Sequence, residues 1–168
     1  MGIKTTAPKK SRELAAVEDF TLPIDDSLFF KLVRLVNLTA RPFSQTIGRA
    51  NQLSLNDWRA MLVLANHPGV AASEVALLTG LDKMTVSRSI AALERRGRLI
   101  KREDPNDKRR TLLCLNAAGQ RLFERIGTPA KSRETQLFSV ASNAEQTQLG
   151  RTLDRLIASL LAADGELS

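Results

Sequence analysis

Residues 73–115 contain two helical patterns separated by a glycine, followed by a basic stretch between two short apolar runs. Ser73 can accept a hydrogen bond from the free amides that open a helix, and apolar residues at helical spacing follow it. Gly80 ends this first helix, because glycine adopts a positive φ without steric cost. Asp82 is the next N-cap candidate, and Leu81 should pack inward between the two helices. The pattern predicts two short helices joined by a tight turn.

The second helix is predicted over Lys83 to Arg96. Its apolar residues Val86, Ile90 and Leu93 are spaced four and three residues apart, which aligns them in one stripe. The polar and basic residues near the helix start fall largely outside that stripe, and they are Lys83, Thr85, Ser87 and Arg88. We therefore expect one buried apolar face and, near the N-terminus, an exposed polar and basic side.

A β-hairpin is predicted directly after the second helix. Leu99–Arg102 and Thr111–Leu115 are typical of short strands, and the polar tip between them contains a proline and an asparagine that favour turns. The hairpin, residues 99–115, is long enough to form the wing of a winged helix-turn-helix. Helix, turn, helix and basic hairpin follow one another in the order that this DNA-binding fold requires.

The predicted elements carry side chains suited to double-stranded DNA. The start of the second helix would enter the major groove, where Arg88 can pair with a guanine edge. Lys83, Thr85 and Ser87 stand at the same helix end, whose free amides favour phosphate. The wing tip carries three consecutive cations, Lys108, Arg109 and Arg110. These cations suit the minor groove, because its negative potential attracts them.

The wing resembles that of the MarR family of bacterial transcription regulators. The residues that carry the resemblance are Asp104-Pro105-Asn106-Asp107-Lys108-Arg109-Arg110, followed by Leu113-Cys114-Leu115-Asn116 and Gly119. Thr85-Val86-Ser87-Arg88 resembles the recognition helix of that family, and the similarity extends from about Leu28 to Leu161. Asn116 stands where threonine is more usual in the family, and either residue can cap a helix.

The resemblance implies that Asp107 pairs with Arg109 and so holds this arginine ready for the minor groove. It also implies a homodimer in which the N- and C-terminal helices of two subunits interlock. A two-fold dimer places two recognition helices on half-sites about one DNA turn apart, so the operator should be a near-palindrome. In the family a small ligand, often an aromatic acid or phenol, lowers DNA affinity by fixing the spacing of the two lobes. We expect a repressor that such an effector releases from DNA.

Long helical patterns flank the predicted reader. The first covers about residues 25–50, with a cap among residues 25–27, and Pro42 should kink or break it near Leu38 or Thr39. A shorter helix opened by Ser54 should support the reader from behind.

The C-terminal flank, about residues 117–163, is predicted to form two helices, Ala117–Phe138 and Ala144–Leu161. The second of these carries an apolar stripe too extensive for a solvent-facing helix, and we assign it to a dimer interface. The alternative is that it folds back on its own subunit.

The expected fold is mainly α-helical with a small β-hairpin wing. We predict a basic N-terminal arm over residues 1–22 and a single domain over 23–168, with its winged helix-turn-helix at about 54–116. The dimerisation helices lie on both sides of this unit, at about 25–50 and 117–163.

Charge and composition agree with a nucleic-acid partner. The chain has 168 residues and a formal net charge of +7. Between Asp82 and Thr111, ten Lys and Arg residues stand against five Asp and Glu residues, so this segment supplies five of those seven charges. A single cysteine and the lack of a signal-peptide-like or membrane-spanning apolar run predict a cytoplasmic protein without membrane contact.

Three residues are candidates for contact with an effector. Trp58 could form one wall of an aromatic pocket, although a lone tryptophan on an amphipathic helix is more often a core residue. Arg41 and Arg59 could each neutralise an anionic effector, although an arginine is more often solvated at the surface.

The sequence also bears on other classes of function. It contains no phosphate-binding glycine loop, nucleophile elbow or histidine pair, so we expect no enzyme, metal or cofactor. His67 stands alone and is assigned to a helix end, and Cys114 is interpreted as a small buried group in the wing. One rival is an adaptor whose winged helix binds protein, but its wing would not need such charge. Another is an RNA binder, which would usually show more aromatic residues for base stacking.

Overall fold

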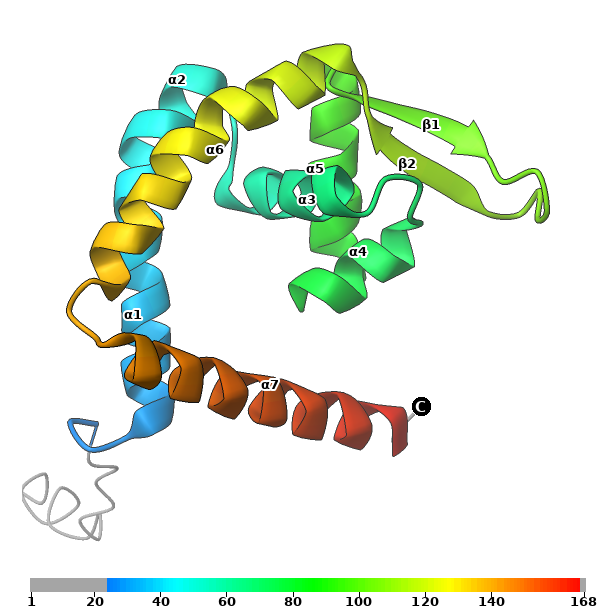
Figure 1. Ribbon diagram of the computed structural model, residues 1–168. Helices are drawn as coiled ribbons and strands as arrows, with labels where there is room; N and C mark the ends of the chain where they lie inside the picture. Colours follow the sequence, from blue (N-terminus) through cyan, green and yellow to red (C-terminus); the bar gives the residue numbers. More distant parts are fainter. Residues whose placement is uncertain (1–23, 167–168) are drawn as a thin grey trace, which may run out of the picture.

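The computed structural model describes residues 24–166 (Figure 1). The described chain is mainly helical with one two-stranded antiparallel sheet, as expected. Its elements are α1 (Leu28–Phe43), η2 (Ser44–Gly48), α2 (Arg49–Asn51), α3 (Leu55–Asn66), α4 (Ala72–Thr79), α5 (Lys83–Arg95), β1 (Leu99–Glu103), β2 (Thr111–Leu115), α6 (Ala117–Phe138) and α7 (Asn143–Glu166). The arm expected over residues 1–22 lies outside the described residues, and the domain boundaries stay a prediction.

One lobe carries the helix-turn-helix and the wing. It consists of α3, α4, α5 and the β1–β2 hairpin, and the hairpin projects at the end of the molecule opposite α1 (Figure 1). Helix α6 starts beside the hairpin and runs back to α1, and α7 then extends beneath the lobe (Figure 1). No helix within residues 24–166 is long and apolar enough to cross a membrane.

The core lies between the helices of this lobe. Met61, Leu64, Val75, Val86 and Leu93 are its largest fully buried side chains, and they come from α3, α4 and α5. The predicted stripe of α5 is buried, because Val86, Ile90 and Leu93 all face this core. The spacing of the apolar residues in α5 therefore determines which side of this helix remains exposed to solvent.

Trp58 of α3 ties the lobe to the two long helices. Its ring stacks between Phe43 of α1 and Phe123 of α6, with centroids 6.2 and 5.3 Å away. The tryptophan is only 6% exposed, so the core interpretation is confirmed. Offset aromatic pairs of this kind stabilise by about 0.5–1.5 kcal/mol beyond the area that they bury.

The N-terminal helix differs from expectation at its proline. Ser27 is the N-cap, and the chain stays α-helical through Phe43, so the helix does not break at Leu38 or Thr39; the kink expected there stays a prediction. The irregular segment is η2, a π-helical turn that follows Pro42. The Thr46 hydroxyl donates to the Pro42 carbonyl at 2.6 Å, and such bonds four residues back disturb the regular helix ladder.

The first helix of the helix-turn-helix starts earlier than predicted. Its N-cap is Ala71, and Ser73 lies within the first turn, so the capping role predicted for Ser73 is wrong. The Glu74 carboxylate accepts a hydrogen bond from the Ala71 amide at 2.8 Å and takes over the task of satisfying that end. Gly80 ends the helix with φ +67°, as the sequence predicts.

The wing is an antiparallel hairpin in which Leu99 pairs with Leu115 and Glu103 with Thr111. The first strand extends to Glu103, one residue beyond the expected end. Cys114 is half-buried in β2 and lies opposite Ile100, and His67 is the exposed C-cap of α3. No group of three metal-ligating side chains occurs among the described residues.

Candidate nucleic-acid interface

Asp82 fixes the start of α5. Its carboxylate accepts one hydrogen bond from the Thr85 amide at 2.8 Å and another from the Thr85 hydroxyl at 2.6 Å. The Thr85 side chain, then its backbone amide, holds the pKa of Asp82 below its ordinary value of 3.8. The carboxylate therefore stays charged at the helix N-terminus, where negative charge is stabilised. Thr85 is engaged in this cap and is half-buried.

The other predicted residues of α5 face outward. Lys83, Ser87 and Arg88 are exposed, and neither cation has an ion-pair partner within residues 24–166. Met84 is also on this surface and is 66% exposed. Met84 is not among the residues predicted from polarity, although its spacing from Ser87 and Arg88 places it on their side of the helix.

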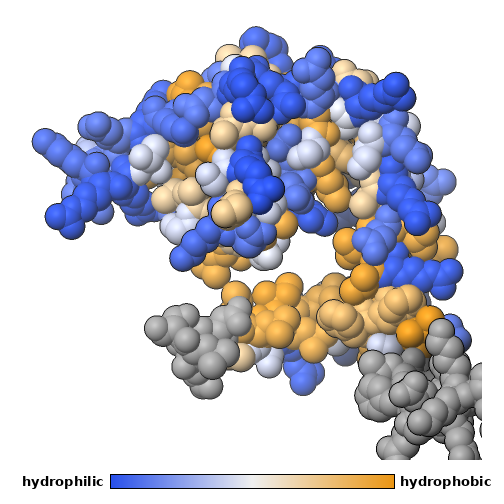
Figure 2. All heavy atoms as spheres, turned by 180° about the vertical axis from the view of Figure 1, so that it is seen from behind, coloured by the Kyte–Doolittle hydropathy of each residue, from blue (hydrophilic) through white to orange (hydrophobic). Residues whose placement is uncertain are grey.

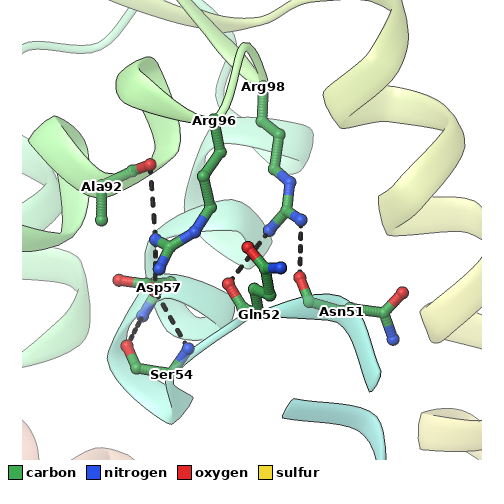
Figure 3. Close-up of polar contacts among 7 residues, drawn as sticks. All are labelled: Asn51, Gln52, Ser54, Asp57, Ala92, Arg96 and Arg98. Carbon is green, nitrogen blue, oxygen red and sulfur yellow. Dashed lines mark hydrogen bonds and ion pairs between the residues drawn. The ribbon is translucent and has the colours of Figure 1, made fainter. Parts of the chain in front are cut away.

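The C-terminal end of α5 is fixed to the preceding helices by two arginines (Figure 3). Arg98 donates to the carbonyl oxygens of Asn51 at 2.5 Å and Gln52 at 3.4 Å, which are free at the end of α2. Burial, and then the charge of Arg96, lowers the pKa of Arg98. Arg125 of α6 donates to the Asn51 side chain at 2.7 Å. Residues from three parts of the chain thus meet at this corner.

Arg96 makes a second link, to the start of α3 (Figure 3). Its guanidinium lies 3.8 Å from the Asp57 carboxylate and donates to the Ala92 carbonyl at 3.4 Å. Asp57 is buried and forms a reciprocal cap with Ser54, through bonds of 2.9 and 3.0 Å. These bonds anchor the C-terminal end of α5, whereas near its N-terminal end the side chains of Lys83, Ser87 and Arg88 remain exposed.

The wing tip is a tight turn stabilised by its own carboxylates. The Asp104 side chain accepts from the Asn106 amide at 2.9 Å, and the Asp107 side chain accepts from the Arg109 amide at 3.0 Å. The family resemblance implies a pair between the Asp107 carboxylate and the Arg109 guanidinium. In the structure, Asp107 instead contacts the backbone of Arg109. This contact leaves the Arg109 side chain exposed and without an acidic partner in the described part of the chain.

Arg110 differs from its two neighbours. Its guanidinium pairs with the Glu74 carboxylate at the start of α4 and lies 3.9 Å from the Asp104 carboxylate. The Ala71 amide, followed by Arg110, lowers the pKa of Glu74. Arg110 thus joins the wing to the first helix of the helix-turn-helix, whereas Lys108 and Arg109 remain exposed at the tip.

A pocket of about 480 Å³ lies between the lobe and the long helices. Apolar side chains of α1, α3 and α6 dominate its lining, and Arg59, Arg133 and Glu134 are its charged residues. Trp58 also lines it, so this residue is both core and pocket wall. Arg41 is exposed and does not line the pocket.

Fold and interface together define a winged helix-turn-helix protein. The sequence profile of the MarR family matches residues 51–110, which span most of the lobe just described. A protein described as a transcriptional regulator for the hcr operon of Thauera aromatica is 30% identical over 117 residues, covering 69% of this chain and 70% of that protein. The chain belongs to the MarR family, whose members regulate transcription and are not enzymes.

Two further comparisons extend over more of the chain. The homoprotocatechuate degradative operon repressor of Escherichia coli is 24% identical over 133 residues, or 79% of this chain and 89% of that protein. A MarR/EmrR family transcriptional regulator from Acinetobacter sp. ADP1 has a solved structure that superposes with a TM-score of 0.76. It is 27% identical, and the match covers 83% of this chain and 98% of that one.

Proposed function

We propose that this protein is a homodimeric transcription repressor that binds a palindromic operator in double-stranded DNA. The observation that carries the proposal is that some cations of the lobe bind other residues of the chain while others are exposed. Arg96, Arg98 and Arg110 are used inside the lobe, whereas Lys83, Arg88, Lys108 and Arg109 are exposed without acidic partners among residues 24–166. These four cations lie at the two places where this fold meets DNA, and Arg95 and Arg102 are two further exposed cations of the lobe without ion-pair partners among residues 24–166.

The roles of the interface residues follow from their contacts. Arg88, Ser87 and Lys83 serve the major groove, with Arg88 on a guanine edge. Arg109 serves the minor groove and Lys108 a phosphate. Three residues that the sequence predicts at the DNA interface stabilise its shape instead of contacting DNA: Thr85 within the cap, Asp107 in the wing turn, and Arg110 between the wing and α4.

The homodimer is supported by apolar surface on the terminal helices. Leu28 and Phe29 of α1 are each 77% exposed, and Leu160 of α7 is 68% exposed. Figure 2 shows hydrophobic residues gathered along α7; the exposed ones are Leu149, Leu156, Ile157, Leu160 and Leu161. A surface of this kind is unfavourable in water, and a second copy of the same helices would cover it.

The pocket between α1, α3 and α6 is the proposed effector site. The ring of Trp58 offers a flat apolar wall, and Arg59 offers a positive charge, so an aromatic acid would fit its chemistry. Such a ligand can release the operator only if it binds the DNA-incompetent spacing of the two lobes more tightly than the competent spacing. In a panel of aromatic carboxylates, Arg59→Ala should weaken release, and Arg41→Ala, outside the pocket, should not.

A regulator of transcription acts where the chromosome is, so we place the protein in the cytoplasm.

Selection of bound duplexes from a random pool, at two salt concentrations, tests the proposed function directly. The expected result is an enriched inverted repeat with half-sites about one turn apart. A folded dimer that enriches no sequence at either salt would contradict the proposal and favour an adaptor that binds protein.

A further inference from the structure

Met84 is an exposed apolar side chain in the middle of a polar surface. It is the second residue of α5, and 66% of its surface is accessible. Ser87 and Arg88 follow it at spacings of three and four, so the three residues share one side of the helix. Lys83 and Arg88 place positive charge next to it. A partner that covers Met84 must therefore combine an apolar group with negative charge.

The major groove of DNA offers this combination. The 5-methyl group of thymine is the apolar group on its base edges, and phosphates border the groove on both sides. The first residues of a recognition helix reach base edges in this fold. Methionine is unbranched and flexible, so its thioether and terminal methyl can adapt to a methyl group at that depth.

We propose that Met84 reads a thymine in each half-site through contact with its 5-methyl group. Met84 would thus be a specificity-determining residue beside Arg88, which reads a guanine. The inference rests on the proposed function, since it requires α5 to enter the major groove. Its basis is the position of Met84 on the exposed side of α5, between two cations that have no acidic partners in the described chain.

A competing explanation is that Met84 belongs to a protein-docking surface of the lobe. Leu77 and Leu78 of α4 are also exposed, at 60% and 53%. The cations beside Met84 favour DNA over an apolar protein surface. The two explanations can be separated by experiment, because only the DNA explanation requires the 5-methyl group of thymine.

The test replaces single thymines of the selected operator by deoxyuridine, which removes the methyl group and keeps the hydrogen-bonding edge. The full-length protein is titrated onto each duplex by fluorescence anisotropy. One position per half-site should weaken binding by about fourfold, the effect of about 0.8 kcal/mol for one buried methyl or methylene group. Met84→Ala should bind thymine and deoxyuridine duplexes equally, and Met84→Leu should keep part of the difference.

Leu77→Ala is the matched control, because it shortens an exposed apolar side chain on α4 and should retain the full thymine preference. Two results would overturn the inference: wild-type binding that is insensitive to every deoxyuridine, or a Met84→Ala variant that keeps the preference. A Met84→Ala variant that binds both duplexes as tightly as the wild type does would favour the docking surface. A wild-type protein that binds no selected duplex would instead overturn the proposed function itself.

Discussion

Arg88 is the side chain on which base reading chiefly depends in this account. It is exposed near the N-terminal end of α5, and no carboxylate within residues 24–166 forms an ion pair with it. Arg88→Ala should cost about 1–3 kcal/mol of binding free energy per half-site and relax discrimination at one base position. Lys108→Ala, which removes a phosphate contact, should weaken all sequences more evenly.

Competition titrations with operators altered at single positions will separate these two effects. The assignment of roles is wrong if both variants reduce affinity equally for every sequence. Both side chains are at the surface, so circular dichroism spectra of the variants should match that of the wild type.

Gly119 shows how a single position can hold two elements together. It lies in the first turn of α6, where an added Cβ would overlap the carbonyl oxygen of Arg98. Gly119→Ala should therefore lower the free energy of unfolding by about 1–3 kcal/mol, the usual cost of overpacking. Gly127→Ala is the control, because a Cβ there meets nothing and alanine favours the helix by about 0.5–1 kcal/mol.

Urea denaturation followed by circular dichroism measures both changes, which should have opposite signs. A Gly119→Ala variant as stable as Gly127→Ala would show that α6 does not approach the turn after α5 as closely as described.

At the scale of elements, the contact between Arg110 and Glu74 joins the wing to the start of α4. If Arg110 acts by position, Arg110→Ala should weaken DNA binding without changing the dependence of affinity on salt. Lys108→Ala should reduce the slope of log K against log [salt] by about 0.9 per subunit, the value for one lost phosphate contact. The charge swap Glu74→Arg with Arg110→Glu should recover part of the affinity lost by Arg110→Ala. A salt slope reduced in Arg110→Ala as in Lys108→Ala would identify Arg110 as a direct DNA contact.

The cap of α5 should respond to acid. Because hydrogen bonds from Thr85 lower the pKa of Asp82, its carboxylate stabilises the folded state above the ordinary value of 3.8. This contribution is lost as the pH falls through the lower pKa of the folded state. The stability difference between wild type and Asp82→Asn should therefore shrink as the pH falls below about 3.8. Urea titrations at a series of pH values measure it, and a difference that grows toward acid would contradict this role.

The elements were predictable where their signals are local. Gly80, Asp82 and the apolar spacing of α5 define the helix-turn-helix without knowledge of the rest of the chain. The start of α4 was mispredicted at Ser73, because the helix begins two residues earlier, where the Glu74 carboxylate accepts a hydrogen bond from the Ala71 amide. The π-helical turn after Pro42, which is accompanied by a hydrogen bond from the Thr46 hydroxyl to the Pro42 carbonyl, was not predicted.

The candidate site was predicted in its residues more than in its contacts. Exposure of Lys83, Ser87 and Arg88 follows from helical periodicity, which a sequence displays directly. The pairing of Arg110 with Glu74 spans 36 positions, and that of Arg98 with Asn51 spans 47. Contacts at such separations arise from packing. No local sequence pattern indicates which arginine will bind another residue of the lobe and which will remain exposed to solvent.

At the scale of the whole molecule, the proposed homodimer explains two features together. It covers the apolar surfaces of α1 and α7, and its two-fold symmetry matches that of a palindromic operator. In the proposed dimer these helices would hold the two recognition helices at a fixed separation, and α1, together with α6, also borders the proposed effector pocket. A change of that separation is then the means by which a ligand could alter DNA affinity.

The spacing of the operator half-sites tests whether a fixed dimer reads both of them. The measurement is the dissociation constant of the full-length protein for the selected operator and for the same operator with five base pairs inserted between its half-sites. The insertion, about half a DNA turn, should reduce binding to that of a single half-site, because the second recognition helix then faces the wrong side of the duplex. Equal affinity for both duplexes would contradict a fixed dimer that reads two half-sites.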